Sequence, residues 1–231
     1  MDETRNVAII PARGGSKRIP GKNVKLFAGK PIIAYSIQVA LESGLFQRLI
    51  VSTDSEEIAD VARKWGAEVP FLRPAEFSDD FTGTDEVILH ALDWLDSAGE
   101  AYNYVCCIYA TAPLLQAEYL RRGFQSVRRE QAATAFSVTT YSYPIFRALT
   151  LDDNHRLDMI WPEHFTSRSQ DLREVYHDAG QFYWAHIGKY RVGKRFFSND
   201  AVPVIVPRHL VQDIDTEEDW IVAEKQYNLI V

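Results

Sequence analysis

Strand-like and helix-like segments alternate along the first 140 residues, and this alternation limits the fold more than any other feature. Short apolar runs typical of buried strands lie at 7–10, 48–53, 68–71, 104–109 and 135–140. Segments with helical spacing of apolar residues lie between them, at 31–44, 54–66, 84–98 and 117–129. Strands that alternate with helices predict βαβ units, and therefore a Rossmann-like α/β fold with a mostly parallel sheet flanked by helices.

The remaining elements follow a less regular segment. Residues 141–176 have no clean periodicity, whereas 181–186 and 202–206 have strand-like composition, and a helix is expected to close the chain near residue 228. In an open parallel sheet, ligands bind at the carboxyl ends of the strands. We therefore expect the loops that follow the strands to converge on one crevice.

The loop after the first strand concentrates positive charge. Residues 11–23 read Pro-Ala-Arg-Gly-Gly-Ser-Lys-Arg-Ile-Pro-Gly-Lys-Asn. Gly14 and Gly15 permit a sharp turn and a close approach to a ligand, and successive backbone N–H groups in such a turn form an anion-binding hollow. Four cationic side chains surround it: Arg13, Lys17, Arg18 and Lys22. This pattern indicates a polyphosphate site, although neither the P-loop nor the dinucleotide spacing is present. The alternative is a basic surface loop after an edge strand.

Two carboxylates near the C-terminus form a second candidate site. Asp213 and Asp215 are two residues apart, so on an extended segment both side chains share a face. Paired carboxylates together with phosphate oxygens suit Mg²⁺. Alternatively, Asp215 caps the last helix with Glu218 as its capping-box partner, and Asp213 is solvated. A similar capping box is expected earlier, from Asp54 and Glu57.

Both segments resemble the CMP-sugar synthetases, the cytidylyltransferases that activate acidic sugars with CTP. The loop at 11–23 is similar to their N-terminal signature over its whole length, and Asp-Ile-Asp-Thr-Glu-Glu-Asp at 213–219 is similar to their metal motif. The resemblance covers nearly the whole chain and is weakest at 141–163. It implies a nucleotide-diphospho-sugar transferase fold in a single domain, residues 1–231. It further implies a homodimer, with 141–176 as an arm whose large apolar side chains are too many for a solvated loop.

The resemblance also implies roles for individual residues. Arg13, Lys22 and Asp215 would be catalytic, with Lys22 nearest the reacting phosphate. Asp213 and Asp215 would hold Mg²⁺, with Mn²⁺ as a possible substitute. The implied nucleotide-binding residues are Ala12, Arg13, Gly14, Ser16, Lys17, Lys22, Asn23, Arg73 and Thr84. For Thr84, a plain helix N-cap is an equally weighted alternative.

The implied sugar-binding residues are Tyr109, Thr111, Arg168, Gln170, Tyr176, His177, Asp178 and Gln181. Arg168 suits bidentate pairing with a sugar carboxylate. Sialic acid synthetases carry Gln-Pro-Thr-Ser-Pro where this chain has Tyr109-Ala-Thr-Ala-Pro, and Asn-Gly where it has His-Asp-Ala-Gly at 177–180. Both departures resemble the branch that transfers CMP to pseudaminic acid, an acidic nine-carbon sugar. The alternatives are N-acetylneuraminate or legionaminate as the sugar, and a non-catalytic nucleotide-binding protein. His177 is either a general base or a hydrogen-bonded pocket residue.

Composition argues against several classes of partner and compartment. The net charge of −7 argues against a nucleic-acid-binding surface, and no apolar stretch is long enough to span a membrane. Cys106 and Cys107 are adjacent in a strand-like run, so they are expected to be buried on opposite faces rather than joined in a disulfide framework. Residues 1–6 lack the regions of a signal peptide. These features lead us to expect a cytoplasmic protein.

Overall fold

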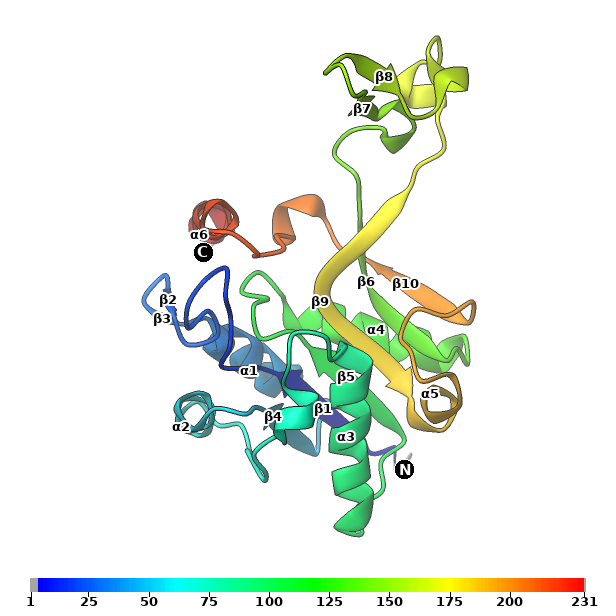
Figure 1. Ribbon diagram of the computed structural model, residues 1–231. Helices are drawn as coiled ribbons and strands as arrows, with labels where there is room; N and C mark the ends of the chain where they lie inside the picture. The colour runs from blue at the N-terminus through cyan, green and yellow to red at the C-terminus, as the bar shows by residue number, and fades with distance from the viewer. Residues whose placement is uncertain (1–3, 231) are drawn as a thin grey trace.

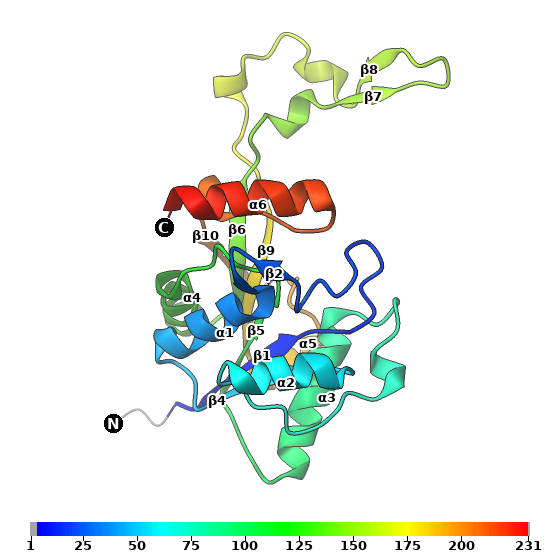
Figure 2. The ribbon, with the colours of Figure 1, turned by 90° about the vertical axis from the view of Figure 1, so that its left-hand side faces the viewer.

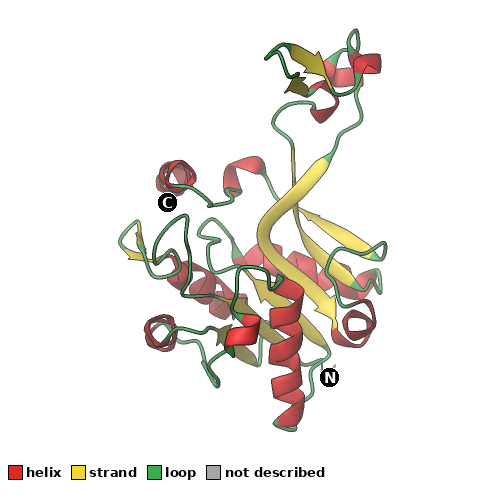
Figure 3. Cartoon of the chain, viewed as in Figure 1, coloured by secondary structure: helices red, strands yellow, loops and turns green. Residues whose placement is uncertain are grey.

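A six-stranded sheet forms the centre of the protein, in the strand order β10–β6–β9–β5–β1–β4 (Figures 1 and 3). The computed structural model describes residues 4–230. Residues 1–3, part of the N-terminal segment that lacks the features of a signal peptide, lie outside the described residues. The sheet strands are β1 (Asn6–Pro11), β4 (Arg48–Ser52), β5 (Tyr104–Ile108), β6 (Thr134–Thr140), β9 (Tyr176–His186) and β10 (Ala201–Ile205). The helices are α1 (Ile32–Ser43), α2 (Glu56–Lys64), α3 (Thr84–Ser97), α4 (Ala117–Arg129), α5 (Ile187–Gly193) and α6 (Glu217–Ile230).

The predicted, mostly parallel α/β fold is confirmed, with β9 as the exception. Strand β1 pairs in parallel with β4 and β5, and β10 pairs in parallel with β6. Strand β9 runs antiparallel between β5 and β6. The chain enters β9 from the irregular segment that follows β6 rather than through a helical crossover, and only such crossovers require the next strand to be parallel.

The sheet separates two apolar layers. Side chains of α1, α2 and α4 pack with Cys106 on one face, and side chains of α3 and α5 pack with Cys107 on the other. Both cysteines are fully buried and free, as the sequence predicts. Within residues 4–230, no helix is both long and apolar enough to cross a bilayer.

A third apolar cluster attaches the C-terminal helix to the basic loop. Trp220 and Ala223 of α6 pack with Ile19 of the loop, and Ile214 is fully buried beside them. Phe27, in the short β2–β3 hairpin (Leu26–Phe27 and Lys30–Pro31), contacts Trp220 edge to face. This packing brings the two segments singled out from the sequence together, although about 190 residues separate them.

Three local predictions are wrong. The segment 68–71 forms no strand: isolated bridges join Glu68 to Ile50 of β4 and Leu72 to Thr53. Ser55, not Asp54, caps α2, because its hydroxyl accepts a hydrogen bond from the Ile58 backbone N–H. At the last helix, the Thr216 hydroxyl accepts from the Asp219 backbone, and the Asp219 carboxylate accepts from the Thr216 backbone. This capping box leaves Asp215 outside the cap.

Residues 141–175 project from the end of the sheet and form a separate lobe (Figure 2). The strands β7 (Leu149–Leu151) and β8 (Leu157–Met159) form an antiparallel hairpin there. Several large apolar side chains in this lobe are exposed, among them Tyr143, Leu149, Leu151, Leu157 and Phe165. The lobe therefore offers an apolar surface that its own chain does not cover.

Candidate functional site

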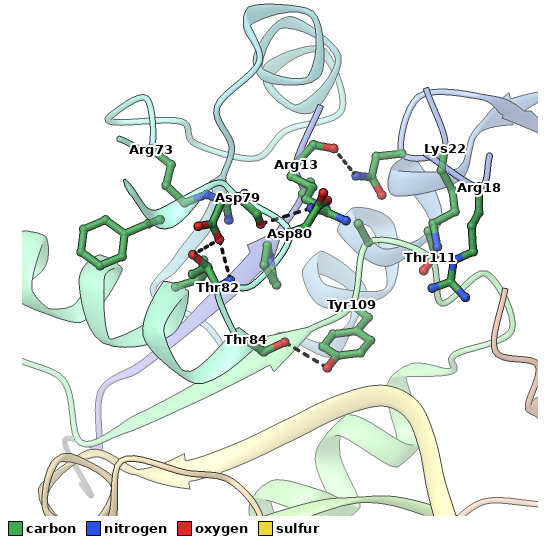
Figure 4. Close-up of a pocket in the computed structure, with 16 residues that line it drawn as sticks. Arg13, Arg18, Lys22, Arg73, Asp79, Asp80, Thr82, Thr84, Tyr109 and Thr111 are labelled. Carbon is green, nitrogen blue, oxygen red and sulfur yellow. Dashed lines mark hydrogen bonds and ion pairs between the residues drawn. The ribbon is translucent and has the colours of Figure 1, made fainter. Parts of the chain in front are cut away.

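A cavity of about 380 Å³ opens where β1 and β5 end (Figure 4). Its volume lies within the range of small-molecule sites. Eight of the predicted nucleotide- and sugar-binding residues line it: Ala12, Arg13, Lys22, Asn23, Arg73, Thr84, Tyr109 and Thr111. The loops after β1 and β5 therefore converge on this cavity as expected, and so does Arg73.

The cations of the loop are held in place by other parts of the protein. The Lys22 ammonium donates a hydrogen bond to the Ile214 carbonyl at 2.7 Å and lies 3.7 Å from the Asp215 carboxylate. Arg18, which also lines the cavity, pairs with Asp215 at 2.9 Å. The Asn23 amide donates to the Arg13 carbonyl at 2.9 Å. The folded chain therefore positions Lys22 before any ligand binds.

The N–H groups of the loop are not all available to an anion. The Gly14 backbone N–H donates to the Asp54 carboxylate at 2.8 Å, so this group is already paired. A Cβ atom on Gly14 would lie 3.1 Å from the Ser55 Cβ. Gly14 thus permits a close approach to the start of α2, and its predicted role in nucleotide binding stays a prediction. Sequence reasoning assigned Asp54 to a helix cap and missed this contact.

A turn at 79–82 adds a second feature that the sequence analysis missed. The Asp79 carboxylate accepts hydrogen bonds from the Phe81 and Thr82 backbone N–H groups and from the Thr82 hydroxyl. Asp80 points into the basic loop, where it pairs with Arg13 at 2.6 Å and with Lys17 (Figure 4). The hydrogen bond from Lys17 lowers the pKa of Asp80 the most, and the hydrogen bond from Arg13 lowers it further. An anionic ligand that pairs with both Arg13 and Lys17 must therefore displace the Asp80 carboxylate.

We expect Asp80→Asn to bind inorganic pyrophosphate about 5-fold more tightly than the unmutated protein, because it removes an internal competitor held by two exposed ion pairs. Isothermal titration calorimetry measures this affinity. Asp60→Asn is the matched control, since Asp60 pairs with Arg63 on α2, outside the residues that line the cavity. Unchanged or weaker binding by Asp80→Asn would show that Asp80 does not compete with anions.

Carboxylates line a second cavity, also of about 380 Å³, which includes Asp178, Asp213 and Asp215. Asp215 links the two cavities, because its partners Arg18 and Lys22 line the first one. Removal from water raises the pKa of Asp213, and repulsion from Asp215 raises it further. A cation at this position would offset that repulsion.

The donor set fits Mg²⁺ only in part. Among residues 4–230, no group of three or more His, Cys, Asp or Glu side chains is arranged to hold a metal ion alone. Mg²⁺ commonly uses one or two carboxylates together with substrate phosphates and waters. Asp213 and Asp215 therefore suit an ion that arrives with a phosphorylated ligand.

Arg73 and Thr84 lie on the side of the first cavity away from Lys22 and Arg18 (Figure 4). Arg73 is only 5% exposed, and burial lowers its pKa; its Nε donates to the Ser78 hydroxyl. Thr84 is the first residue of α3, and Gly83 is the N-cap, so the cap alternative for Thr84 is wrong. The Thr84 hydroxyl instead lies 3.1 Å from the Tyr109 hydroxyl.

The predicted sugar-binding residues lie in several places. Tyr109 and Thr111 line the first cavity, whereas His177 and Asp178 line the second. Gln181 is 3% exposed, and its amide donates to the Leu210 carbonyl.

The other three belong to the lobe or its base. Arg168 is exposed and pairs with Asp171, Gln170 lines a separate hollow at the base of the lobe, and the Tyr176 hydroxyl donates to Glu174. One subunit does not bring these side chains to the basic loop. Their binding roles stay predictions.

His177 has one ring nitrogen occupied. Its Nδ1 lies 2.8 Å from the Asp178 carbonyl, which can only accept, so Nδ1 carries a proton. In the neutral ring, Nε2 is then the atom free to accept a proton. The ring also packs against Tyr141, with centroids 4.8 Å apart. Both readings of His177, general base and pocket residue, are compatible with this arrangement.

Known proteins share this sequence and fold. A family model described as cytidylyltransferase matches residues 7–230. A pseudaminic acid cytidylyltransferase from Campylobacter jejuni subsp. jejuni serotype O:2 is 43% identical over 225 residues, covering 97% of each chain. A CMP-N,N'-diacetyllegionaminic acid synthase from Legionella pneumophila is 32% identical over 228 residues, again covering 97% of each chain.

A solved structure extends the comparison to three dimensions. A CMP:2-keto-3-deoxy-manno-octonic acid synthetase complexed with CTP matches with a TM-score of 0.71 and 14% sequence identity, covering 99% of this chain and 100% of that chain. At this identity the match establishes a shared fold.

Proposed function

Because the chain belongs to the cytidylyltransferase family, we propose that it transfers CMP from CTP to the anomeric hydroxyl of pseudaminic acid and releases pyrophosphate. The observation that carries this proposal is the 43% identity to a pseudaminic acid cytidylyltransferase over 97% of both chains. The cavity supports it, since basic-loop side chains predicted to hold phosphates line one side and Tyr109, predicted to contact the sugar, lines the same space.

The proposed reaction is an in-line displacement at the α-phosphorus of CTP. The anomeric oxygen forms a bond to the α-phosphorus and loses its proton, while the bond from that phosphorus to the β-phosphate oxygen breaks and pyrophosphate leaves. Lys22, Arg13 and Lys17 offset the charge that develops on the departing group. Lys22 is only 20% exposed, so its charge is less screened by water than those of the surface cations. The protein's contribution is mainly orientation and charge stabilisation.

We propose Mg²⁺ as the cofactor, held by Asp213 and Asp215, with Mn²⁺ as a possible substitute. The metal would neutralise phosphate charge and help to orient the nucleotide. Thr216 and Asp219 form the cap of α6 without Asp215. The Asp215 carboxylate is therefore not used by the cap, which supports its proposed role as a metal ligand.

The direct test is to incubate the purified protein with CTP, Mg²⁺ and pseudaminate, and to identify the products by mass spectrometry. We expect CMP-pseudaminate and pyrophosphate in equal amounts, and neither when CTP or sugar is omitted. A protein that binds CTP but releases no pyrophosphate with any acidic nine-carbon sugar would be a non-catalytic nucleotide-binding protein.

We also propose a cytoplasmic location. The proposed substrate, CTP, is a cytoplasmic nucleotide, and Cys106 and Cys107 form no disulfide, as is usual in a reducing compartment.

We further propose that the whole chain acts as one domain whose lobe at 141–176 pairs two subunits. Leu157 and Phe165 are 70% and 73% exposed there, and contiguous exposed apolar groups mark contact surfaces. Such pairing would also give Arg168 and Gln170 a route to the partner's cavity, which they do not reach in their own chain.

Light scattering at micromolar concentration should therefore give the mass of a dimer. We expect Leu157→Asp combined with Phe165→Asp to produce monomers, because burying two carboxylates at an apolar interface is costly. Val192→Asp is the matched control, since Val192 is 86% exposed on α5, outside the lobe. An unmutated protein that is monomeric and fully active would exclude the proposed pairing.

A further inference from the structure

Two carboxylates share the four cations of the basic loop. Asp80 pairs with Arg13 and Lys17, whereas Asp215 lies within ion-pair distance of the other two cations. Asp215 belongs to the proposed metal site, so its charge stays in place when a nucleotide binds. An anion that pairs with both Arg13 and Lys17, in contrast, takes the place of the Asp80 carboxylate. Asp80 is therefore the carboxylate that has to leave the loop and return to it in each reaction cycle.

The turn at 79–82 keeps Asp80 beside the cavity when its ion pairs are broken. The Asp79 carboxylate closes the turn by accepting two backbone hydrogen bonds and one hydroxyl hydrogen bond within it. Gly83 follows as the N-cap of α3, and its N–H donates to the Glu86 carboxylate at 3.0 Å. None of these bonds uses the Asp80 side chain, which is 37% exposed. A rotation of that side chain is thus enough to leave or re-enter the loop.

A carboxylate tethered in this way competes strongly with a bound anion. Its effective concentration is on the order of millimolar, as for other short connections. When a phosphate oxygen loosens from Arg13 or Lys17, Asp80 pairs with the freed cation and prevents the oxygen from returning. The displaced carboxylate also repels the anion that replaced it. CTP has further contacts through its nucleoside, whereas pyrophosphate is held by its charges alone, so the competition affects pyrophosphate most.

We infer that Asp80 is a positioning residue for product release: it takes Arg13 and Lys17 back from pyrophosphate and thereby speeds the departure of this product. The inference rests on the proposed function, since pyrophosphate is a product only if the chain transfers CMP from CTP. Asp80 acts through the two cations and does not touch the reacting atoms. Its removal should therefore slow release without slowing the transfer step.

The test is the dissociation rate of inorganic pyrophosphate, measured from its exchange in phosphorus NMR with Mg²⁺ present. Asp80→Asn keeps the shape of the side chain but removes the charge, and it should slow dissociation about 5-fold, because affinity differences within one site arise mostly in the dissociation rate. Asp80→Glu keeps the charge and should release pyrophosphate within about 2-fold of the normal rate. Glu76→Gln is the matched control, since it removes one charge from the same segment, outside the residues that line the cavity.

Turnover experiments separate release from chemistry. With enzyme in excess over CTP, the first transfer by Asp80→Asn should keep its rate within about 2-fold, whereas added pyrophosphate should inhibit this variant about 5-fold more strongly. The NMR measurement needs no turnover, so a failure of the proposed reaction is distinguishable from a failure of this inference. Normal pyrophosphate dissociation from Asp80→Asn would overturn the inference. So would a first transfer slowed as much as release, or equally slow release from Glu76→Gln.

Discussion

Replacing Lys22 by alanine will lower kcat about 100-fold or more, the loss expected when a donor to developing transition-state charge is removed. Lys22 is firmly fixed in the cavity, because the Ile214 carbonyl and the Asp215 carboxylate hold its ammonium from the C-terminal segment. An ammonium that is already in place needs no reorganisation when pyrophosphate departs. Steady-state pyrophosphate release with saturating CTP and pseudaminate measures the effect.

Lys25→Ala is the matched control for this experiment. Lys25 follows in the same loop, but it pairs with Glu217 and lies over the Trp220 ring, outside the residues that line the cavity. It should keep near-normal turnover. Melting temperatures of both variants establish that they are folded. A folded Lys22→Ala protein with normal kcat would remove Lys22 from the catalytic role.

Asp215→Asn should be nearly inactive, and activity of the unmutated protein should disappear in EDTA and return with Mg²⁺ or Mn²⁺. Asparagine keeps the shape of Asp215 but loses the charge that a divalent cation requires. The same charge pairs with Arg18 and attracts Lys22, so its loss also disturbs the cations of the first cavity. Pyrophosphate release across a titration of each metal is the measurement.

Thermal unfolding distinguishes this role from a structural one. Since Thr216 and Asp219 cap α6, Asp215→Asn should leave the melting temperature nearly unchanged. Glu217→Gln removes a charge two residues away and serves as the control for general electrostatics, so it should stay active. Full activity in chelator, or a stable and active Asp215→Asn protein, would contradict the metal role.

The sequence predicted the sheet and the cavity because both depend on local pattern and chain direction. Alternating apolar runs indicate βαβ units, and loops after parallel strands converge whatever their distance in sequence. Adjacent capping candidates were harder to separate. Asp54 and Ser55, like Asp215 and Thr216, are both good N-cap types, and the path of the entering chain selects between them.

The missed residues depend on contacts that no local pattern contains. Asp54 meets Gly14 across 40 positions, and Asp80 meets Arg13 across 67. A carboxylate opposite a basic loop has no signature of its own in one sequence. Arg168 is different, since it lies in a segment without sequence periodicity. Only the fold shows that this segment projects from the end of the sheet (Figure 2).

The choice of sugar is the central claim, and initial rates of pyrophosphate release with CTP and a single sugar test it most directly. Tyr109 stands where sialic acid synthetases carry Gln, so the cavity offers a ring and one hydroxyl in place of a primary amide. We predict that kcat/KM for pseudaminate exceeds that for N-acetylneuraminate by about 100-fold or more, and that Tyr109→Gln narrows this ratio while Arg168→Ala weakens both sugars alike. Equal use of the two sugars by the unmutated enzyme would contradict the claim and leave a cytidylyltransferase of broader specificity.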